Sequence, residues 1–299
     1  MTLQQLKYVV TVAECGNITE AAKQLFVSQP TVTSAIHDLE KEMQIVIFIR
    51  TNKGVILSED GERFLGHARQ VLEQVDLIEG IYKDDVVSKP HFAVSCQHYS
   101  FAVNAFVDVI REFDAYQYDF TIREEQTHEI IEDVTNLKSE LGVIYLSSKN
   151  TEVISKMLKR NELEFTELFT ATPHVFICDS HPLASKNSIT MDDLQDYPYL
   201  TYEQGEYNSQ YFSEEFVSTL DSRKNIRVRD RATLFNLIIG LNGYTVCSGV
   251  ISAELNGRNI ISKPLDVEEY MRIGIISRKG VVLSRYAREY IEALKAHCM

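Results

Sequence analysis

Short polar side chains gather at one predicted helix start near the N-terminus. Ser28 is a good N-cap, and Pro30 is compatible with the first turn of the helix that follows. Val32, Ile36 and Leu39 recur at helical spacing, so they face inward and leave a polar face near the helix start. The residues of that polar face are Gln29, Thr31, Thr33, Ser34 and His37.

This polar face could read base edges in the major groove of DNA. Gln29 can bond an adenine edge through two atoms, and Pro30 and the threonine methyl groups can contact a thymine methyl group. The free N–H groups of a helix start can also hold a phosphate. We expect DNA contacts from Ser28, Gln29, Pro30, Thr31, Thr33, Ser34 and His37, joined by Arg50 and Lys53.

Two helices and a hairpin are expected to position this face. Thr2 caps a first helix that Gly16 ends, and a second helix starts near Thr19. Apolar residues 45–49 and 55–57 predict two strands, with residues 52–54 at the tip of a wing that carries Arg50 and Lys53. The order is typical of a winged helix-turn-helix, although a small helical subdomain with a solvated polar face has the same spacing.

A long helix follows, from about residue 59 to Tyr82. Ser58 precedes acidic residues in the first turn, as the helix dipole favours. A heptad seam runs along this helix and must be buried against a partner, so we predict a dimerisation helix. The alternative is packing against the chain's own next domain. The seam consists of Phe64, Ala68, Val71, Val75 and Ile78.

Composition bounds the class of protein. The chain has 299 residues, of which 44% are hydrophobic and 24% charged, with five scattered cysteines. It has no apolar run long enough to span a membrane and no secretion signal at its N-terminus, so we expect a cytoplasmic protein with reduced thiols. The net charge is −13, and residues 1–65 alone are net −2. Bulk electrostatics therefore do not predict DNA binding, which must depend on local geometry.

Beyond Lys89-Pro90, apolar runs alternate with helical patterns. The β-α-β-α-β order of residues 91–146 predicts a parallel, doubly wound sheet. A second similar unit follows, and a last strand at residues 272–276 and a last helix at residues 284–296 end the chain. The helices predicted for the second unit lie near residues 191–196, 211–219 and 232–240.

Ligands of open α/β sheets bind beyond the C-terminal ends of the strands. The segments expected there are rich in hydroxyls, amides and free N–H groups, which suits a small polar ligand that could be anionic. Glu203 would oppose an anion. The alternative for each position is a helix cap or turn residue. The predicted effector-binding residues are Ser95, Gln97, His98, Ser100, Ser147, Thr201, Tyr202 and Ser248.

Residues 1–66 resemble the N-terminal domain of LysR-type transcriptional regulators. The segments that carry the resemblance are Leu6-Lys7-Tyr8, Ala21-Ala22-Lys23-Gln24-Leu25, Val27-Ser28-Gln29-Pro30-Thr31-Val32-Thr33, Ile36, Leu39-Glu40, Phe48-Ile49-Arg50 and Leu57-Ser58-Glu59-Asp60-Gly61. The resemblance implies that residues 29–42 enter the major groove, that residues 50–54 form the wing, and that the protein is a homodimer or homotetramer.

The chain departs from that family at five positions. Relatives often have a basic residue near Ser34 and His37. They usually have Gly and Pro where this chain has Gln44 and Val46, and an acidic residue where it has Ile49. These changes make the turn from helix to wing less typical, and they weaken the expectation of tight nonspecific phosphate binding.

Over the rest of the chain the resemblance is one of pattern. It implies an α/β effector region of two Rossmann-like lobes, similar to a type-2 periplasmic binding protein. The expected domains are a winged helix-turn-helix at 1–58, a linker and dimerisation helix at 59–88, and an effector-binding domain at 89–299. Lobe I would cover about 90–164 and 268–299, and lobe II about 165–267.

These patterns together predict a regulator that binds double-stranded promoter DNA under the control of a small metabolite in the cleft between the lobes. The alternatives are a small-molecule-binding protein without a DNA role and a redox-sensing regulator of the same family. Peroxide-sensing relatives carry paired cysteines near residues 200–210, where this chain has none. His174, Cys178 and His181 form a weak metal pattern, so no metal or cofactor is expected, and no nucleophile–base set indicates an enzyme.

Overall fold

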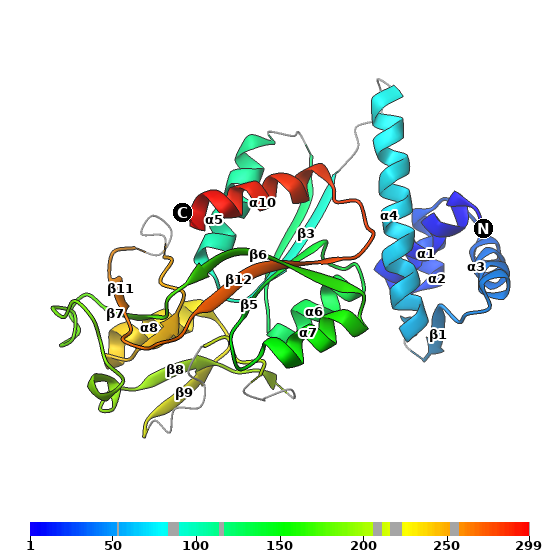
Figure 1. Cartoon of the computed structure of the whole chain (residues 1–299). Helices are drawn as coiled ribbons and strands as arrows, with labels where there is room; N and C mark the ends of the chain where they lie inside the picture. The colour runs from blue at the N-terminus through cyan, green and yellow to red at the C-terminus, as the bar shows by residue number, and fades with distance from the viewer. Residues whose placement is uncertain are drawn as a thin grey trace. The chain divides into compact units, whose positions relative to one another are not determined.

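The computed structural model describes residues 1–52, 54–82, 90–113, 117–205, 211–215, 223–251 and 257–298 (Figure 1). Two compact units divide the chain, one built mainly from residues 1–91 and the other from most of residues 92–299. Each unit is described by itself below. No helix in the described ranges is both long and apolar enough to cross a membrane.

The first unit begins with three helices, and the predicted caps Thr2 and Ser28 lie at the starts of the first and the third. Thr2 forms a capping box with Gln5 at the start of α1 (Leu3–Cys15), and Gly16 ends that helix with a φ of 61°. Asn17 caps α2 (Ile18–Gln24), and the Ser28 hydroxyl accepts from the Thr31 N–H at the start of α3 (Gln29–Met43). Caps form within a few residues, which is why the sequence alone predicts Thr2 and Ser28, whereas Asn17 is a cap that it did not single out.

The wing is a two-stranded antiparallel hairpin, β1 (Phe48–Thr51) and β2 (Gly54–Leu57). The first strand starts at Phe48, three residues later than predicted, because residues 45–47 run from the end of α3 into the hairpin. The Val55 N–H donates to the Gly16 carbonyl at 2.9 Å, so the wing is pinned to the end of α1. A Cβ on Gly54 would lie 2.2 Å from that same carbonyl oxygen, so the close approach requires glycine.

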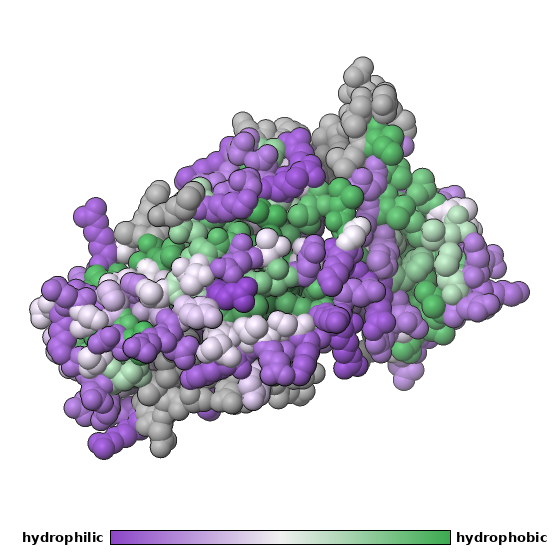
Figure 2. Space-filling view, viewed as in Figure 1, coloured by the Kyte–Doolittle hydropathy of each residue, from purple (hydrophilic) through white to green (hydrophobic). Residues whose placement is uncertain are grey.

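The long helix α4 (Glu59–Tyr82) is as long as expected. Its first turns pack on the helix-turn-helix, where Leu65 is buried and Phe64 lies against the same apolar cluster. Val71 and Ile78, farther along the predicted seam, are 41% and 58% exposed. Hydrophobic residues accordingly reach the surface toward the C-terminal end of α4 (Figure 2).

The first lobe of the second unit is a five-stranded sheet in the order β4-β3-β5-β12-β6. Its strands are β3 (His91–Cys96), β4 (Asp119–Glu124), β5 (Leu141–Leu146), β6 (Leu163–Ala171) and β12 (Met271–Arg278). Helices α5 (Ser100–Glu112) and α10 (Arg285–Cys298) cover one face, and α6 (Thr127–Thr135) and α7 (Thr151–Arg160) cover the other (Figure 1).

The parallel order predicted for residues 91–146 is confirmed for β3 and β5, but the last strand, for which no direction was predicted, makes the sheet a mixed one. β3 and β5 are parallel, but β12 runs antiparallel to both β5 and β6. The direction of β12 is set by its return from the second lobe, and strand patterning does not encode direction. β6 pairs with β12 as far as Ala171, so the chain leaves the first lobe after that residue, later than the expected boundary near residue 165.

The second lobe is built on two small sheets, β10-β7-β11 and the parallel pair β8-β9, linked by a bridge between Tyr199 and Tyr244. Its elements are β7 (His174–Cys178), β8 (Tyr199–Tyr202), β9 (Asn225–Val228), α8 (Arg231–Leu241), β10 (Thr245–Cys247) and β11 (Ile260–Pro264). The helix predicted at 191–196 is one short 3₁₀ turn, Asp192–Leu194.

The helix predicted at 211–219 is wrong where it can be tested. Residues 211–215 form a turn and a bend, and residues 216–219 lie outside the described residues. The apolar spacing of Tyr211, Phe212 and Phe216 suggests a helix face, but the polar residues between them make long-range contacts that local patterning cannot show.

Candidate DNA-reading face and effector site

The N-terminal half of α3 presents the predicted polar face to the surface. Val32, Ile36 and Leu39 are buried in the core of the helix-turn-helix, which turns the intervening side chains outward. The exposed residues on the outward side are Ser28, Gln29, Pro30, Thr31, Ser34 and His37, and Thr33 is half-buried. Gln29 Nε2 donates to Thr33 Oγ1 at 3.0 Å, which orients the amide along the helix.

A groove of about 520 Å³ lies between this face and the wing. Six predicted DNA-binding residues line it, namely Gln29, Pro30, Thr33, Ser34, His37 and Arg50. Ser28 and Thr31 are instead joined by a 2.7 Å hydrogen bond at the helix cap, outside the groove lining. Lys53 lies outside the described residues. The structure therefore brings the base-reading candidates and one basic wing residue together.

Glu40 is a part of this site that sequence reasoning missed. Its carboxylate accepts from the N–H groups of Ile47 and Phe48 at 2.7 and 3.1 Å. This pair of hydrogen bonds fixes the start of the wing to α3. Glu40 belongs to a segment that carries the family resemblance, but local patterning does not show this role, because its partners lie seven and eight residues farther along the chain.

In the second unit, four predicted effector-binding residues are buried, and three of them are hydrogen-bonded within the protein. Ser95 Oγ lies 2.7 Å from Asp133 Oδ2, and the Ser147 N–H donates to Asn150 Oδ1 at 2.7 Å. Gln97 Nε2 donates to Thr127 Oγ1 at 2.6 Å. Ser100, in the first turn of α5, is 5% exposed. These placements agree with the alternative of cap and turn residues more than with direct ligand contacts.

The other four predicted residues lie in the second lobe or face it. Thr201 and Tyr202 end β8 and are half-buried, and Ser248 is 5% exposed just after β10. The imidazole of His98 stacks on the Tyr202 ring with 3.8 Å between ring centroids and 6° between planes. His98 comes from the first lobe and Tyr202 from the second, so this pair marks the cleft between the lobes.

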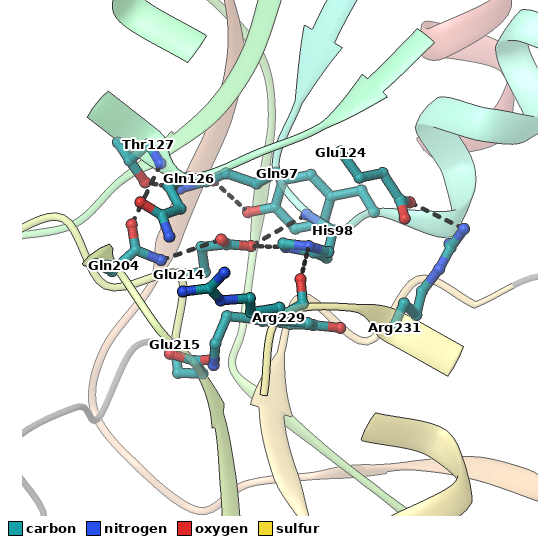
Figure 3. A network of polar contacts seen from close by, with 12 residues as sticks. Gln97, His98, Glu124, Gln126, Thr127, Gln204, Glu214, Glu215, Arg229 and Arg231 are labelled. Atoms are coloured by element: carbon teal, nitrogen blue, oxygen red, sulfur yellow. Dashed lines mark hydrogen bonds and ion pairs between the residues drawn. The ribbon is translucent and has the colours of Figure 1, made fainter. Parts of the chain in front are cut away.

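Two carboxylates that the sequence analysis did not single out meet this pair (Figure 3). Glu214 Oε2 accepts from the His98 main-chain N–H at 3.1 Å and lies 2.8 Å from His98 Nδ1. Glu215 Oε1 accepts from the Tyr202 N–H at 2.6 Å. Both residues fall in the segment that was predicted to be helical, and their partners His98 and Tyr202 are too distant along the chain for local patterning to reveal these contacts.

Several ionisable side chains lie close together in this cleft, and most of them are shielded from water. Burial, followed by the neighbouring charge of Glu214, raises the pKa of Glu215 to about 8. Burial disfavours the charged form of His98, but the ion pair and hydrogen bond with Glu214 outweigh it, so the pKa of His98 is raised. Burial raises the pKa of Glu124 although Arg231 lies 2.9 Å away.

A pocket of about 460 Å³ opens beside the cluster. Its lining consists of His98, Glu124, Glu125, Gln126, His128, Glu129, Glu132, Gly205 and Arg229. The second lobe contributes Arg229, which is paired with Glu203. Four carboxylates face one arginine here, so this pocket does not favour the anionic ligand charge that the sequence suggested.

The cysteines do not form a site. All five are free, and burial raises the pKa of Cys96, of Cys247 and of Cys298, the last to about 12. A thiol that stays protonated is a poor nucleophile. Within the described ranges, no group of three or more His, Cys, Asp or Glu residues is arranged to hold a metal ion.

Comparisons with known proteins identify the family of both parts of the chain. The family model described as bacterial regulatory helix-turn-helix protein, lysR family, matches residues 3–62, and the LysR substrate binding domain matches residues 95–299. The uncharacterized HTH-type transcriptional regulator YvbU of Bacillus subtilis is 28% identical over 99% of this chain and 98% of its own length.

The DNA-binding transcriptional dual regulator OxyR of Escherichia coli is 23% identical over 99% of this chain and 95% of its own length. Among solved structures, a full-length OxyR variant from Pseudomonas aeruginosa has a TM-score of 0.65 at 21% identity and covers 99% of this chain and 95% of that one. This likeness shows a shared fold over the whole chain. The chain therefore belongs to the LysR family of bacterial transcription regulators, with a DNA-binding helix-turn-helix domain followed by a substrate-binding domain.

Proposed function

We propose that the protein reads its promoter through the groove between α3 and the wing, with Gln29 and Ser34 contacting base edges and Arg50 contacting phosphate. The observation that carries this assignment is the groove itself, which collects six of the nine predicted residues on one exposed face. Regulators of this family are generally non-enzymatic DNA-binding proteins, and we assign no reaction to the chain.

The test is a mobility shift of the full chain with DNA from upstream of its own coding region. Gln29→Ala should weaken specific binding by about 10- to 100-fold, because a good bidentate base contact contributes about 1–3 kcal/mol of discrimination. Arg50→Ala should weaken binding to all sequences and lower the salt dependence. Lys41→Ala is the matched control, since Lys41 is exposed on the same helix but outside the groove. If Gln29→Ala binds like Lys41→Ala, the assignment of α3 fails.

We further propose that the effector binds between the lobes at His98 and Tyr202. The support is that these two residues, one from each lobe, stack on each other and carry main-chain N–H groups aimed into the cleft. A thermal-shift screen of small metabolites on the full chain would find the effector, since a ligand that binds only the folded state must stabilise it. His98→Ala should abolish the shift, and an unchanged shift would place the site elsewhere.

Peroxide sensing has less support, although relatives include proteins named hydrogen peroxide-inducible genes activator. Burial keeps the thiols of Cys96, Cys247 and Cys298 protonated, and thiolate character governs oxidation by peroxide. We therefore favour a small-molecule effector over a redox signal.

A further inference from the structure

Residues 211–215 are an irregular segment whose last three residues lie buried in the cleft between the lobes. Ser213, Glu214 and Glu215 are 7%, 6% and 2% exposed. Glutamates are seldom buried so completely unless they are paired or hydrogen-bonded, because removing a carboxylate from water is costly. Two adjacent buried glutamates in a segment without regular structure therefore call for a specific role.

The segment is held to the first lobe at three places. Glu214 accepts from the main chain of His98 and pairs with its imidazole. Thr127 Oγ1, at the start of α6, donates to the Phe212 carbonyl at 2.8 Å. The Tyr145 hydroxyl, from β5, donates to the Glu215 carbonyl at 3.3 Å.

The segment is also held to the end of β8 in the second lobe. Glu215 Oε1 accepts from the Tyr202 N–H at 2.6 Å, and Gln204 Nε2 donates to Glu214 Oε1 at 3.1 Å. Figure 3 shows Glu214 between Gln204 and His98, with Glu215 below it. Residues 211–215 thus bridge the lobes through their own side chains and carbonyl groups.

The positions that these carboxylates occupy are those where a bound anion would be held. His98 follows β3 and precedes the N-terminus of α5, and Tyr202 is the last residue of β8. Main-chain N–H groups beyond strand ends and near helix starts are the usual donors to small anions in α/β folds. Each of these two donors is already bonded to a carboxylate of the chain itself.

We propose that residues 211–215 are a built-in occupant of the effector cleft, and that a carboxylate-bearing effector displaces Glu214 from His98 and Glu215 from Tyr202. This inference rests on the proposed effector site. Displacement would break the bridge between the lobes, so binding would be coupled directly to lobe movement. The adjoining pocket is lined with glutamates, so the remainder of the effector is expected to be neutral or cationic.

The charges of Glu214 and Glu215 favour release of residues 211–215 from the cleft. Glu214 and Glu215 are adjacent and buried, and their mutual repulsion raises the cost of keeping both charged in the cleft. An external carboxylate would replace one of these charges and allow the segment's own carboxylates to return to water. Residues 211–215 are therefore held by well-placed donors, but the repulsion between Glu214 and Glu215 weakens their hold on the cleft.

Chemical rescue tests whether these donors accept an external carboxylate. In the full-length Glu214→Ala protein, acetate should raise the unfolding temperature several degrees more than it does in the wild type, where Glu214 occupies the donors. Chloride at the same ionic strength and acetamide at the same concentration should have no such effect. Glu152→Ala is the control variant, since Glu152 is an exposed carboxylate paired with Lys156. An equal acetate response in all three proteins overturns the proposal.

If Glu214→Ala does not fold, hydrogen exchange of Glu214→Gln replaces this measurement. The amides of residues 211–215 should exchange at least about tenfold faster in Glu214→Gln than in the wild type, because a charge-assisted bond contributes about 1.5–3 kcal/mol. Unchanged protection would mean that the Glu214 carboxylate does not hold the segment, and the proposal would fall.

A DNA footprint separates this inference from the proposed function. On DNA from upstream of the protein's own coding region, Glu214→Gln should bind the same segment as the wild type but with an altered footprint or bend, without any effector. If Glu214→Gln binds this DNA with a wild-type footprint, the proposal that residues 211–215 occupy the cleft is overturned. The assignment of α3 and the wing to DNA binding is then unaffected. A wild-type protein that does not bind this DNA specifically would instead contradict the proposed function.

Discussion

At the scale of single residues, the sequence indicates the right chemical types in the cleft but not their partners. Ser95 and Gln97 were expected to hold a ligand, yet their side chains bond to Asp133 and Thr127 within the first lobe. His98 and Tyr202 do face the cleft, where they meet Glu214 and Glu215 from more than ten residues farther along the chain. Such pairings depend on tertiary structure, which residue type and spacing do not contain.

Glu215 provides a prediction on pH dependence. Its pKa is about 8 in the folded protein and near 4.5 when exposed, so the folded state holds the proton more tightly. The stability that this proton contributes is complete below pH 4.5 and is lost as the pH rises through 8. Glu215→Gln cannot titrate, so its unfolding temperature should fall less between pH 5 and pH 8.5. The difference at pH 8.5 should be on the order of 5 °C.

The measurement is a series of thermal unfolding curves of the full chain across that pH range. Glu152→Gln removes an exposed carboxylate and should keep the wild-type slope, since Glu152 lies at the surface. Parallel slopes for Glu215→Gln and the wild type would show that Glu215 is hydrated, contrary to its 2% exposure.

At the scale of elements, the sequence predicts best those helix boundaries that depend on local interactions. Thr2, Gly16 and Ser28 mark helix boundaries through interactions within a few residues, and the structure has each boundary where it was predicted. The end of α3 is different, because Gln44 takes a left-handed conformation with a φ of 56° and a ψ of 35°. The left-handed region favours glycine, so glutamine is a less suitable residue for this turn.

Gln44→Gly should therefore stabilise the protein. Glycine adopts the left-handed region without the Cβ penalty of about 1 kcal/mol, so the free energy of unfolding should rise by about 0.5–1 kcal/mol in a urea titration. Asp38→Gly, at an exposed position inside the same helix, should change the stability by a similar amount in the opposite direction. If both glycines destabilise, the turn at Gln44 is not left-handed in solution.

At the scale of the whole molecule, periodicity predicts layers but not the direction in which the chain returns. The alternating pattern correctly indicated two α/β lobes joined by crossovers, but β12 enters the first sheet antiparallel to its neighbours. The heptad spacing likewise predicted a face that one chain cannot cover. Phe64 packs against the helix-turn-helix core, whereas Val71 and Ile78 remain exposed. We propose that the outer part of the seam packs against a second copy of the chain.

Dimerisation through this outer seam leads to a prediction about DNA binding. The variant that combines Val71→Asp and Ile78→Asp would place charge where apolar contact is needed. It should therefore sediment as a smaller species than the wild type. Its affinity for a two-half-site DNA should fall at least about 100-fold, because a monomer loses the second half-site and the net-acidic first domain adds little nonspecific attraction. Val282→Asp replaces a valine that is 81% exposed in the second unit and should leave both properties unchanged. A double variant that keeps the wild-type association state would show that α4 does not join the two copies.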